Sequence, residues 1–289
     1  MKKNLVTIIL AMACIAVNAS AARAAALRDI HASERELFGR YTDASEFTEK
    51  WTWDIGSEIY YVKYEEPDFM EDKGAMYGLT GSVTMRDALM LKLEGRFALG
   101  EVDYTSVSTG SMDDVDDYTF ETRGLVGYDF PFEGFLFTPY LGIAYRYLND
   151  DSGGRTTSTG HRGYERESNY FYSPAGFELL KPLNDDWSAT LCFEYDIFWH
   201  GVQESHLSDA IGGLGDVEND QEGGYGLRGS LKLRKRGRKY DLIIEPFIRW
   251  WKIDDSEISS VTFSGVVVGY GLEPENKTME VGVNIAVAY

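Results

Sequence analysis

The final segment of the chain, from Met279 to Tyr289, alternates strictly between two kinds of side chain. A strand directs successive side chains to opposite faces, whereas in a helix the side-chain direction repeats after about 3.6 residues. The segment therefore predicts a strand with one apolar face, and its last residue is aromatic. The apolar or aromatic set is opposed by a polar or small set: Val281, Val283, Ile285, Val287 and Tyr289 against Glu280, Gly282, Asn284, Ala286 and Ala288.

Nine more segments show the same two-residue period, beginning at Trp51. Each is long enough for a tilted strand to cross a bilayer, which takes about 9–11 residues. The clearest opposes apolar residues to charged or small ones: Leu89, Leu91, Leu93, Phe97 and Leu99 against Lys92, Glu94, Arg96 and Ala98. The expected strands are about 51–64, 74–86, 89–101, 118–129, 135–147, 169–180, 187–200, 223–234, 240–252 and 279–289.

The connections between these segments alternate in length, which is typical of a barrel with short periplasmic turns and long extracellular loops. Short turns are expected near 86–88, 130–134, 181–186 and 235–239. Longer loops are expected near 65–73, 101–117, 148–168, 201–222 and 253–278.

Alternation alone does not decide which face lies inside, and a soluble sandwich or a lipocalin-like barrel would turn its apolar face inward. Here nearly every strand carries charge on the other face, and aromatic residues such as Trp51, Trp187 and Trp250 gather near strand ends, as in membrane girdles. Charged inward faces also require closure, because an open sheet edge is not stable in hydrocarbon. We therefore predict an all-β fold: a transmembrane antiparallel up-and-down β-barrel of about 10 strands, with 8–12 as the range.

The N-terminal residues 1–24 are predicted to be a signal peptide. Lys2 and Lys3 precede an apolar stretch, and Ala22-Arg23-Ala24 fits a cleavage site, with cleavage after Ala21 as the alternative. Residues 25–50 are expected to form an N-terminal periplasmic segment, with a lumen plug as the alternative, and residues 51–289 the barrel. Once Cys14 is removed with the signal peptide, Cys192 has no partner for an internal disulfide.

The formal net charge of −19 argues against nucleic acid as a partner, because no basic surface could offset it. With these features the chain resembles the bacterial outer-membrane β-barrel superfamily, the small OmpA-like and porin-family barrels. The resemblance implies a Gram-negative outer-membrane location, lipid and lipopolysaccharide as surroundings, and insertion by the barrel-assembly machinery. The assembly signal would be Val281, Val283, Ile285, Val287 and Tyr289. We expect a monomer without cofactor or bound metal.

The lumen is the first candidate site. An interior of about eight strands is just filled by side chains, so ten strands leave little room. Inward charges are therefore expected to pair into a network that fills the lumen, with a narrow ion or solute path as the alternative. The expected members are Glu58, Glu94, Arg96, Glu121, Arg123, Arg146, Glu178, Glu194, Asp196, Arg228, Lys232, Glu245, Arg249 and Glu280.

Two alternative functions use the loops. Ten-stranded barrels include the omptin proteases, and that resemblance implies Asp113 and Asp114 on one wall, with Glu204 and His206 on the other, as catalytic residues. Glu204-Ser205-His206 only loosely matches the family's Asp-x-His, so an enzyme is not expected. Asp196 and His200 are both expected inside, about 13 Å apart at the rise of a strand. A binding protein or adhesin that uses the acidic loops is the other alternative.

Overall fold

The computed structural model describes Ala44 and residues 48–289. The predicted signal peptide, its cleavage site and nearly all of the expected periplasmic segment lie outside the described residues. Within the described part, no helix has the length and apolar character needed to cross a membrane.

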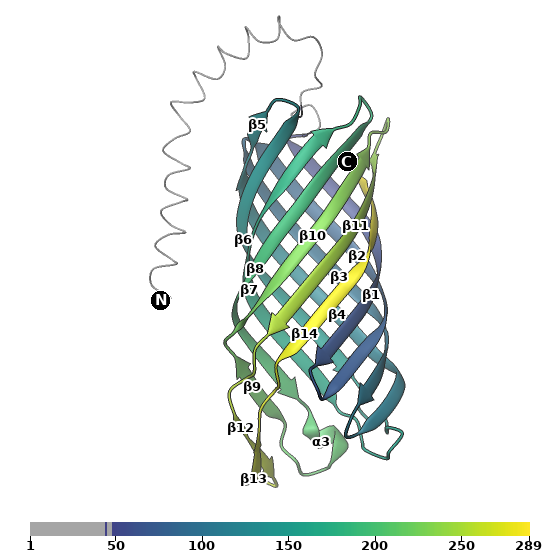
Figure 1. The fold of residues 1–289 in the computed structure, drawn as a ribbon, viewed down its shortest axis with the longest axis vertical. Coiled ribbons are helices and arrows are strands. Elements are labelled where there is room, and N and C mark those ends of the chain that lie inside the picture. Colours follow the sequence, from purple (N-terminus) through teal and green to yellow (C-terminus); the bar gives the residue numbers. More distant parts are fainter. Residues whose placement is uncertain (1–43, 45–47) are drawn as a thin grey trace, which may run out of the picture. The chain divides into compact units, whose positions relative to one another are not determined.

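Ten strands form one closed antiparallel barrel, which confirms the predicted fold and strand number (Figure 1). Closure comes from β14, which pairs with both β11 and β1, and from the direct pairing of β8 with β10. The wall strands are β1 (Trp51–Glu66), β2 (Met70–Asp87), β3 (Leu89–Ser106), β4 (Gly110–Tyr128), β6 (Phe135–Asp151), β7 (Glu165–Pro182), β8 (Trp187–Ser205), β10 (Gly224–Lys235), β11 (Asp241–Ile253) and β14 (Asn276–Ala288).

Four shorter strands and one helical turn decorate the two ends. At the end that carries the short turns and the C-terminus, β5 (Phe130–Phe132) adds to β6. At the opposite end lie β9 (Val217–Gln221), which extends β8, and the turn α3 (Leu207–Ala210). A separate hairpin of β12 (Ser259–Phe263) and β13 (Val266–Gly271) projects from the same end.

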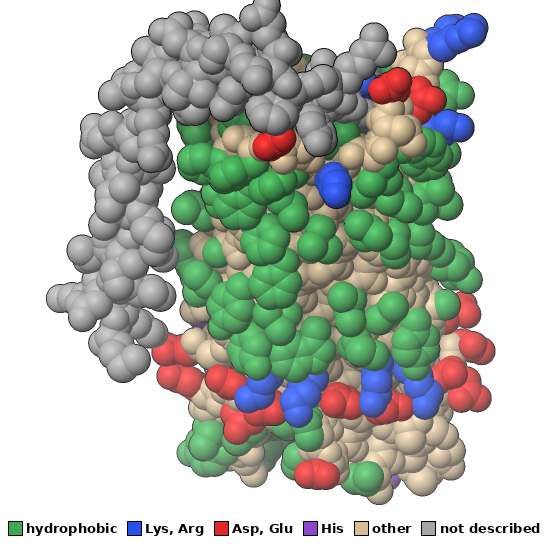
Figure 2. All heavy atoms as spheres, turned by 45° about the horizontal axis from the view of Figure 1, so that its top comes forward, with side chains coloured by type: hydrophobic (Ala, Val, Ile, Leu, Met, Phe, Trp, Pro, Cys, Tyr) green, Lys and Arg blue, Asp and Glu red, His purple; other side chains and the backbone are tan. Residues whose placement is uncertain are grey.

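The outer face of the barrel is an apolar band, as the alternation predicts. On β1 the outward side chains from Trp51 to Tyr61 are exposed and mostly apolar. Ten steps of about 3.3 Å along a strand tilted by about 45° give a height of about 23 Å, close to the apolar band of an outer-membrane barrel. Figure 2 shows this hydrophobic band ending at a belt of charged side chains. Surface ion pairs such as Lys63–Glu71 (2.9 Å) and Lys252–Glu275 (2.8 Å) lie just beyond the band.

The strands continue beyond this belt, so two of the predicted long loops are wrong. The connection between β1 and β2 is only residues 67–69, and that between β3 and β4 only residues 107–109, where loops were expected near 65–73 and 101–117. Long connections remain at 152–164, 206–223 and 254–275. Beyond the belt the outward residues are charged, for example Glu101 and Asp103, so the apolar signal disappears although strand pairing does not.

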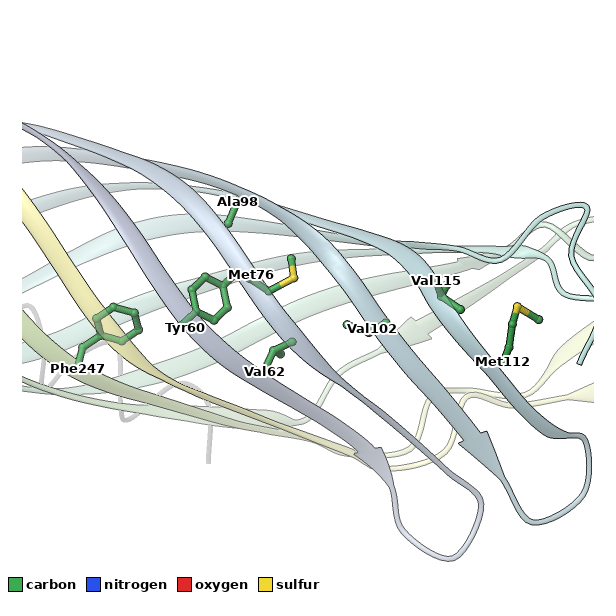
Figure 3. Packing of buried hydrophobic residues seen from close by; sticks show 8 residues of the cluster. All are labelled: Tyr60, Val62, Met76, Ala98, Val102, Met112, Val115 and Phe247. Carbon is green, nitrogen blue, oxygen red and sulfur yellow. The ribbon is translucent and has the colours of Figure 1, made fainter. Parts of the chain in front are cut away.

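The lumen is apolar along part of one wall. Figure 3 shows side chains from β1, β2, β3, β4 and β11 that line the inside towards the extracellular end. Val102 and Val115 are fully buried there and face each other across β3 and β4, although both fall in a predicted loop. The cluster is Tyr60, Val62, Met76, Ala98, Val102, Met112, Val115 and Phe247. Buried apolar clusters therefore accompany the charged side chains inside the barrel, and Val102, Met112 and Val115 continue the apolar wall beyond the belt.

A bulge in β8 shows that the expected inward position of His200 is wrong. Tyr172 pairs with Phe198 but Phe171 pairs with His200, so Trp199 is an extra residue. A bulge of one residue reverses the faces of all residues that follow. His200 is consequently exposed outside the barrel, 3.8 Å from Asp220, instead of inside with Asp196.

We expect Leu93→Arg to lower the free energy of unfolding by about 2–4 kcal/mol, the typical effect of an arginine near the bilayer midplane. Leu93 is 60% exposed in the middle of the apolar part of β3. Thr105→Arg is the matched control, because Thr105 lies exposed on the same face of β3 beyond the belt. Denaturant unfolding in lipid vesicles measures both, and equal effects would contradict the position of the membrane.

Candidate functional site in the barrel lumen

Arg96 of β3 lies at the centre of the lumen and binds carboxylates from three other strands. Its Nε atom donates to Glu121 of β4 (2.9 Å), Nη1 donates to Glu58 of β1 (3.2 Å), and Nη2 donates to Glu280 of β14 (3.1 Å). All four side chains are nearly or fully buried. A single guanidinium therefore ties together four strands of the wall.

Arg228 of β10 extends this contact to the opposite side of the barrel. Its Nε donates to Asp196 of β8 (2.7 Å) and its Nη1 to Glu121 (3.0 Å). The Tyr172 hydroxyl of β7 accepts from Arg228 (2.8 Å) and donates to Glu121 (2.5 Å). Glu121 is thus shared by two arginines and a tyrosine.

Two further arginines complete the central cluster. Arg249 of β11 bridges Glu58 (2.9 Å) and Glu280 (3.0 Å), and Arg146 of β6 donates to Glu280 (2.8 Å) while lying over the ring of Trp251 at 5.3 Å. Nine wall strands contribute to this central cluster, which comprises Glu58, Arg96, Glu121, Arg146, Tyr172, Asp196, Arg228, Arg249 and Glu280.

The remaining strand, β2, contributes Gly78 at this level. A Cβ on Gly78 would lie 2.9 Å from the Glu58 side chain and 2.9 Å from the Ala98 Cβ. The absence of a side chain at this position leaves the space that the Glu58 carboxylate occupies.

A second group of ion pairs lies on the periplasmic side of the central cluster. Arg123 joins Glu94 (2.9 Å) to Glu194 (2.5 Å). The other contacts are Lys92 with Glu94 (2.6 Å) and Glu178 (3.3 Å), Lys232 with Glu245 (3.7 Å), and Arg86 with Asp129 (2.7 Å) and Glu178. Arg86 was missed by the sequence analysis because it falls in the expected turn 86–88, and Asp129, the last residue of an expected strand, was not included in the predicted lumen set.

A third group lies above the membrane zone, where Arg166 of β7 contacts Glu66 (2.6 Å), Glu273 and the Tyr64 hydroxyl (3.4 Å). Sequence reasoning missed it because Glu66, Arg166 and Glu273 all fall in predicted loops. Burial raises the pKa of the nearby Asp150 to about 6.

Among residues 48–289, two cavities in the lumen have volumes of about 150 Å³ and about 60 Å³. The larger lies on the periplasmic side, beside Asp54, Lys92 and Glu178, and the smaller lies towards the extracellular end, beside Asp72 and Asp150. Arg96 lines the larger cavity and Glu280 the smaller, and these two side chains bind each other. The central cluster therefore stands between the two spaces.

The structure places all fourteen predicted lumen residues inside the barrel, and each takes part in at least one ion pair described above. The predicted assembly-signal residues lie on the outward face of β14, with Val281, Ile285 and Tyr289 exposed. Whether they act as a signal stays a prediction.

The residues of the omptin-like alternative do not converge. Asp113 and Asp114 are exposed at a bulge of β4, and their carbonyl oxygens accept from Arg155. Glu204 pairs with Glu167 on the outer face of β7 and β8, and His206 lies 3.9 Å from Glu167. Within residues 48–289, no hydrogen bond or ion pair joins Asp113 or Asp114 to Glu204 or His206.

A family match and one solved structure with a TM-score above 0.5 point to the same architecture. The autotransporter beta-domain family matches residues 70–201, which is less than half of the chain. The outer membrane protease OmpT from Escherichia coli is similar in structure at 10% identity, with a TM-score of 0.56 over 83% of this chain and 96% of that chain. Neisserial surface protein A, at 8% identity, has a TM-score of 0.33 over 81% of this chain and 96% of that chain. The attachment invasion locus protein Ail of Yersinia pestis, also at 8%, has a TM-score of 0.28 over 82% and 99%. No curated protein matches the sequence.

A closed antiparallel barrel with an apolar outer band and a charged lumen defines an outer-membrane protein. The chain has the fold of bacterial outer-membrane β-barrels, and this fold together with the autotransporter beta-domain match points to the cell outer membrane.

We expect Arg96→Met to lower the free energy of unfolding by about 3–5 kcal/mol, because it leaves three buried carboxylates short of a partner. Lys73→Met removes an exposed pair with Glu71 and should change stability little. Guanidinium unfolding followed by tryptophan fluorescence compares the two. A similar small effect for both variants would mean that the central cluster does not hold the barrel together.

Proposed function

We propose that the protein is a non-conducting outer-membrane barrel with a structural or surface role, rather than a narrow channel. The observation that carries this proposal is the central cluster, which crosses the lumen and separates its two cavities. Its members come from opposite walls and are joined across the lumen by ion pairs, so a solute path would require charged side chains to rearrange.

Opening such a path would be unfavourable. Displacing Arg96 leaves Glu58, Glu121 and Glu280 in a space with little water, and breaking one partner of a buried pair costs about 3–5 kcal/mol. Arg249 and Arg146 also hold Glu280, so several pairs must break together. The resting state of the lumen is therefore closed.

The refolded mature protein should show no discrete conductance steps in a planar lipid bilayer. Folding is checked first by heat-modifiable migration on a gel, and a known porin in the same bilayer serves as the assay control. Regular steps from correctly folded protein would contradict the proposal and would favour a water path along the inward charges.

A second candidate role is binding of an external partner, and the β12–β13 hairpin favours it. Val266 is 66%, Val268 60% and Tyr270 75% exposed at the extracellular end. Apolar side chains gathered on an exposed surface are typical of interaction sites. This exposure supports a binding surface on the hairpin, which lies outside the acidic loops that the sequence analysis proposed for an adhesin.

If the hairpin binds, Val266→Ser/Val268→Ser should reduce the adherence of vesicles carrying the protein to surfaces coated with extracellular-matrix protein. The matched control is Glu218→Ser on the neighbouring strand β9, which is also exposed. Unchanged adherence of the hairpin variant would contradict the binding role, but it would not affect the proposal of a closed lumen.

The proposal includes no omptin-like hydrolysis. Glu204 and His206 lie on the outer face of the β7–β8 wall, so their side chains do not point across the barrel opening towards Asp113 and Asp114. Cleavage of a basic peptide that disappears in His206→Ala would contradict this part.

A further inference from the structure

The register of β7 and β8 gathers two carboxylates and an imidazole on the outer face of the wall, at its extracellular end. Glu165 and Glu167 share a face because they are two residues apart on one strand. The main-chain N–H of His206 donates to the Glu165 carbonyl (3.0 Å). This bond places His206, the first residue after β8, beside Glu165 at the start of β7. Ligand atoms of all three side chains lie within 4.8 Å of one another.

Asp216 orients the imidazole of His206. The Nδ1 atom of His206 lies 3.5 Å from an Asp216 carboxylate oxygen, and the main-chain N–H of Ser208 fixes Asp216 by donating to it (3.1 Å). A carboxylate at Nδ1 favours the tautomer that has its proton there and a free lone pair at Nε2, as in the histidine ligands of metal sites.

The Nε2 atom of His206 has no hydrogen-bond partner although it is buried from solvent. It faces the Glu167 carboxylate at 3.9 Å, too far for a hydrogen bond but suitable for two ligands on either side of an ion. A buried polar atom without a partner is destabilising unless something binds it.

The negative charge around the imidazole also favours binding of a cation. Across the described part of the chain, no lysine or arginine forms an ion pair with Glu165 or Glu167. The polar contact of Glu165 is with the Asn149 amide (2.6 Å), and Glu204 faces Glu167 from the neighbouring strand. His206 faces Glu167 at Nε2 and Asp216 at Nδ1, so acidic groups lie on both sides of the imidazole.

We propose that Glu165, Glu167 and His206 bind a divalent transition-metal ion of the Zn²⁺ type, with Asp216 as the positioning residue. One imidazole nitrogen and two carboxylates form a ligand set that Zn²⁺ accepts, and a fourth position would remain for water or an external ligand. Nitrogen favours Zn²⁺ over Mg²⁺ or Ca²⁺, which prefer oxygen ligands. Ligand atoms in such a site lie about 3.3 Å apart, so these side chains need to approach one another by at most about 1.5 Å.

The site explains a local feature of the fold. After β8 ends at Ser205, the chain forms the single helical turn α3 and then strand β9. Within this connection, Asp209 contacts the start of β7 by accepting a hydrogen bond from the Glu165 N–H (3.4 Å). A metal at His206 would fasten this 206–223 connection to the barrel wall.

The test is titration of the refolded protein at pH 8 with Zn²⁺ by calorimetry and with Co²⁺ by visible absorption. We expect one saturable site per chain that persists in millimolar Mg²⁺. His206→Ala and Glu167→Gln should each raise the Kd at least about ten-fold, and Asp216→Asn by about 10–100-fold. Because a proton competes with the metal for Nε2, affinity should be lower in acid than at pH 8.

His200→Ala is the matched control, since His200 lies exposed on the outer face of β8 beside a single carboxylate, Asp220, and this variant should bind the metal as the unaltered protein does. Heat-modifiable migration verifies that each variant folds, and Glu165→Gln replaces any variant that does not. Absence of saturable binding, displacement by Mg²⁺, or equal binding by the His206 and His200 variants would overturn the proposal.

Discussion

The inside of the barrel depends on the buried guanidinium of Arg96, which holds carboxylates from three other strands. A charge in a confined lumen is unfavourable unless its partners surround it, and those partners reach it only in one alignment of the strands. A slip of one residue in β4 would turn Glu121 towards lipid and leave both Arg96 and Arg228 without it. The same contacts that fill the lumen therefore also select the register of the wall.

The lipid imposes the complementary constraint from outside. Backbone groups in the hydrocarbon zone must all be paired, so the sheet has to close, and β14 closes it by pairing with β1 along most of its length. The apolar side chains on the outer face meet the lipid, and rings on neighbouring strands, such as Phe177 and Phe193, also contact one another. Specificity comes instead from the interior, where polar contacts replace the apolar core of a soluble barrel.

The two-residue period was sufficient to predict the membrane zone of every strand. It also predicted which charged residues face inward, because parity along a strand fixes the face once the apolar side is known to meet lipid. The prediction failed where that signal ends: Val102 and Val115 are strand residues with charged neighbours outside, and a pattern based on apolar outward positions does not detect them.

Other features depend on pairing between strands, which a single sequence does not specify. The bulge at Trp199 reverses the face on which His200 lies, and the residues around Trp199 do not predict a bulge. Glu165 and His206 are forty residues apart in the chain, and only the alignment of β7 with β8 brings them together. The Arg166 contacts with Glu66 and Glu273 were missed for the same reason.

The continuation of β1 to β4 past the charged belt has a mechanical consequence. Hydrogen-bonded ribbons ending in the short turns 67–69 and 107–109 are stiff, so their tips stand at a fixed height above the lipid headgroups. Ordering of these segments is completed when the barrel folds. An external molecule that meets this rim would thus lose less of its binding free energy to loop ordering than one that meets a flexible loop.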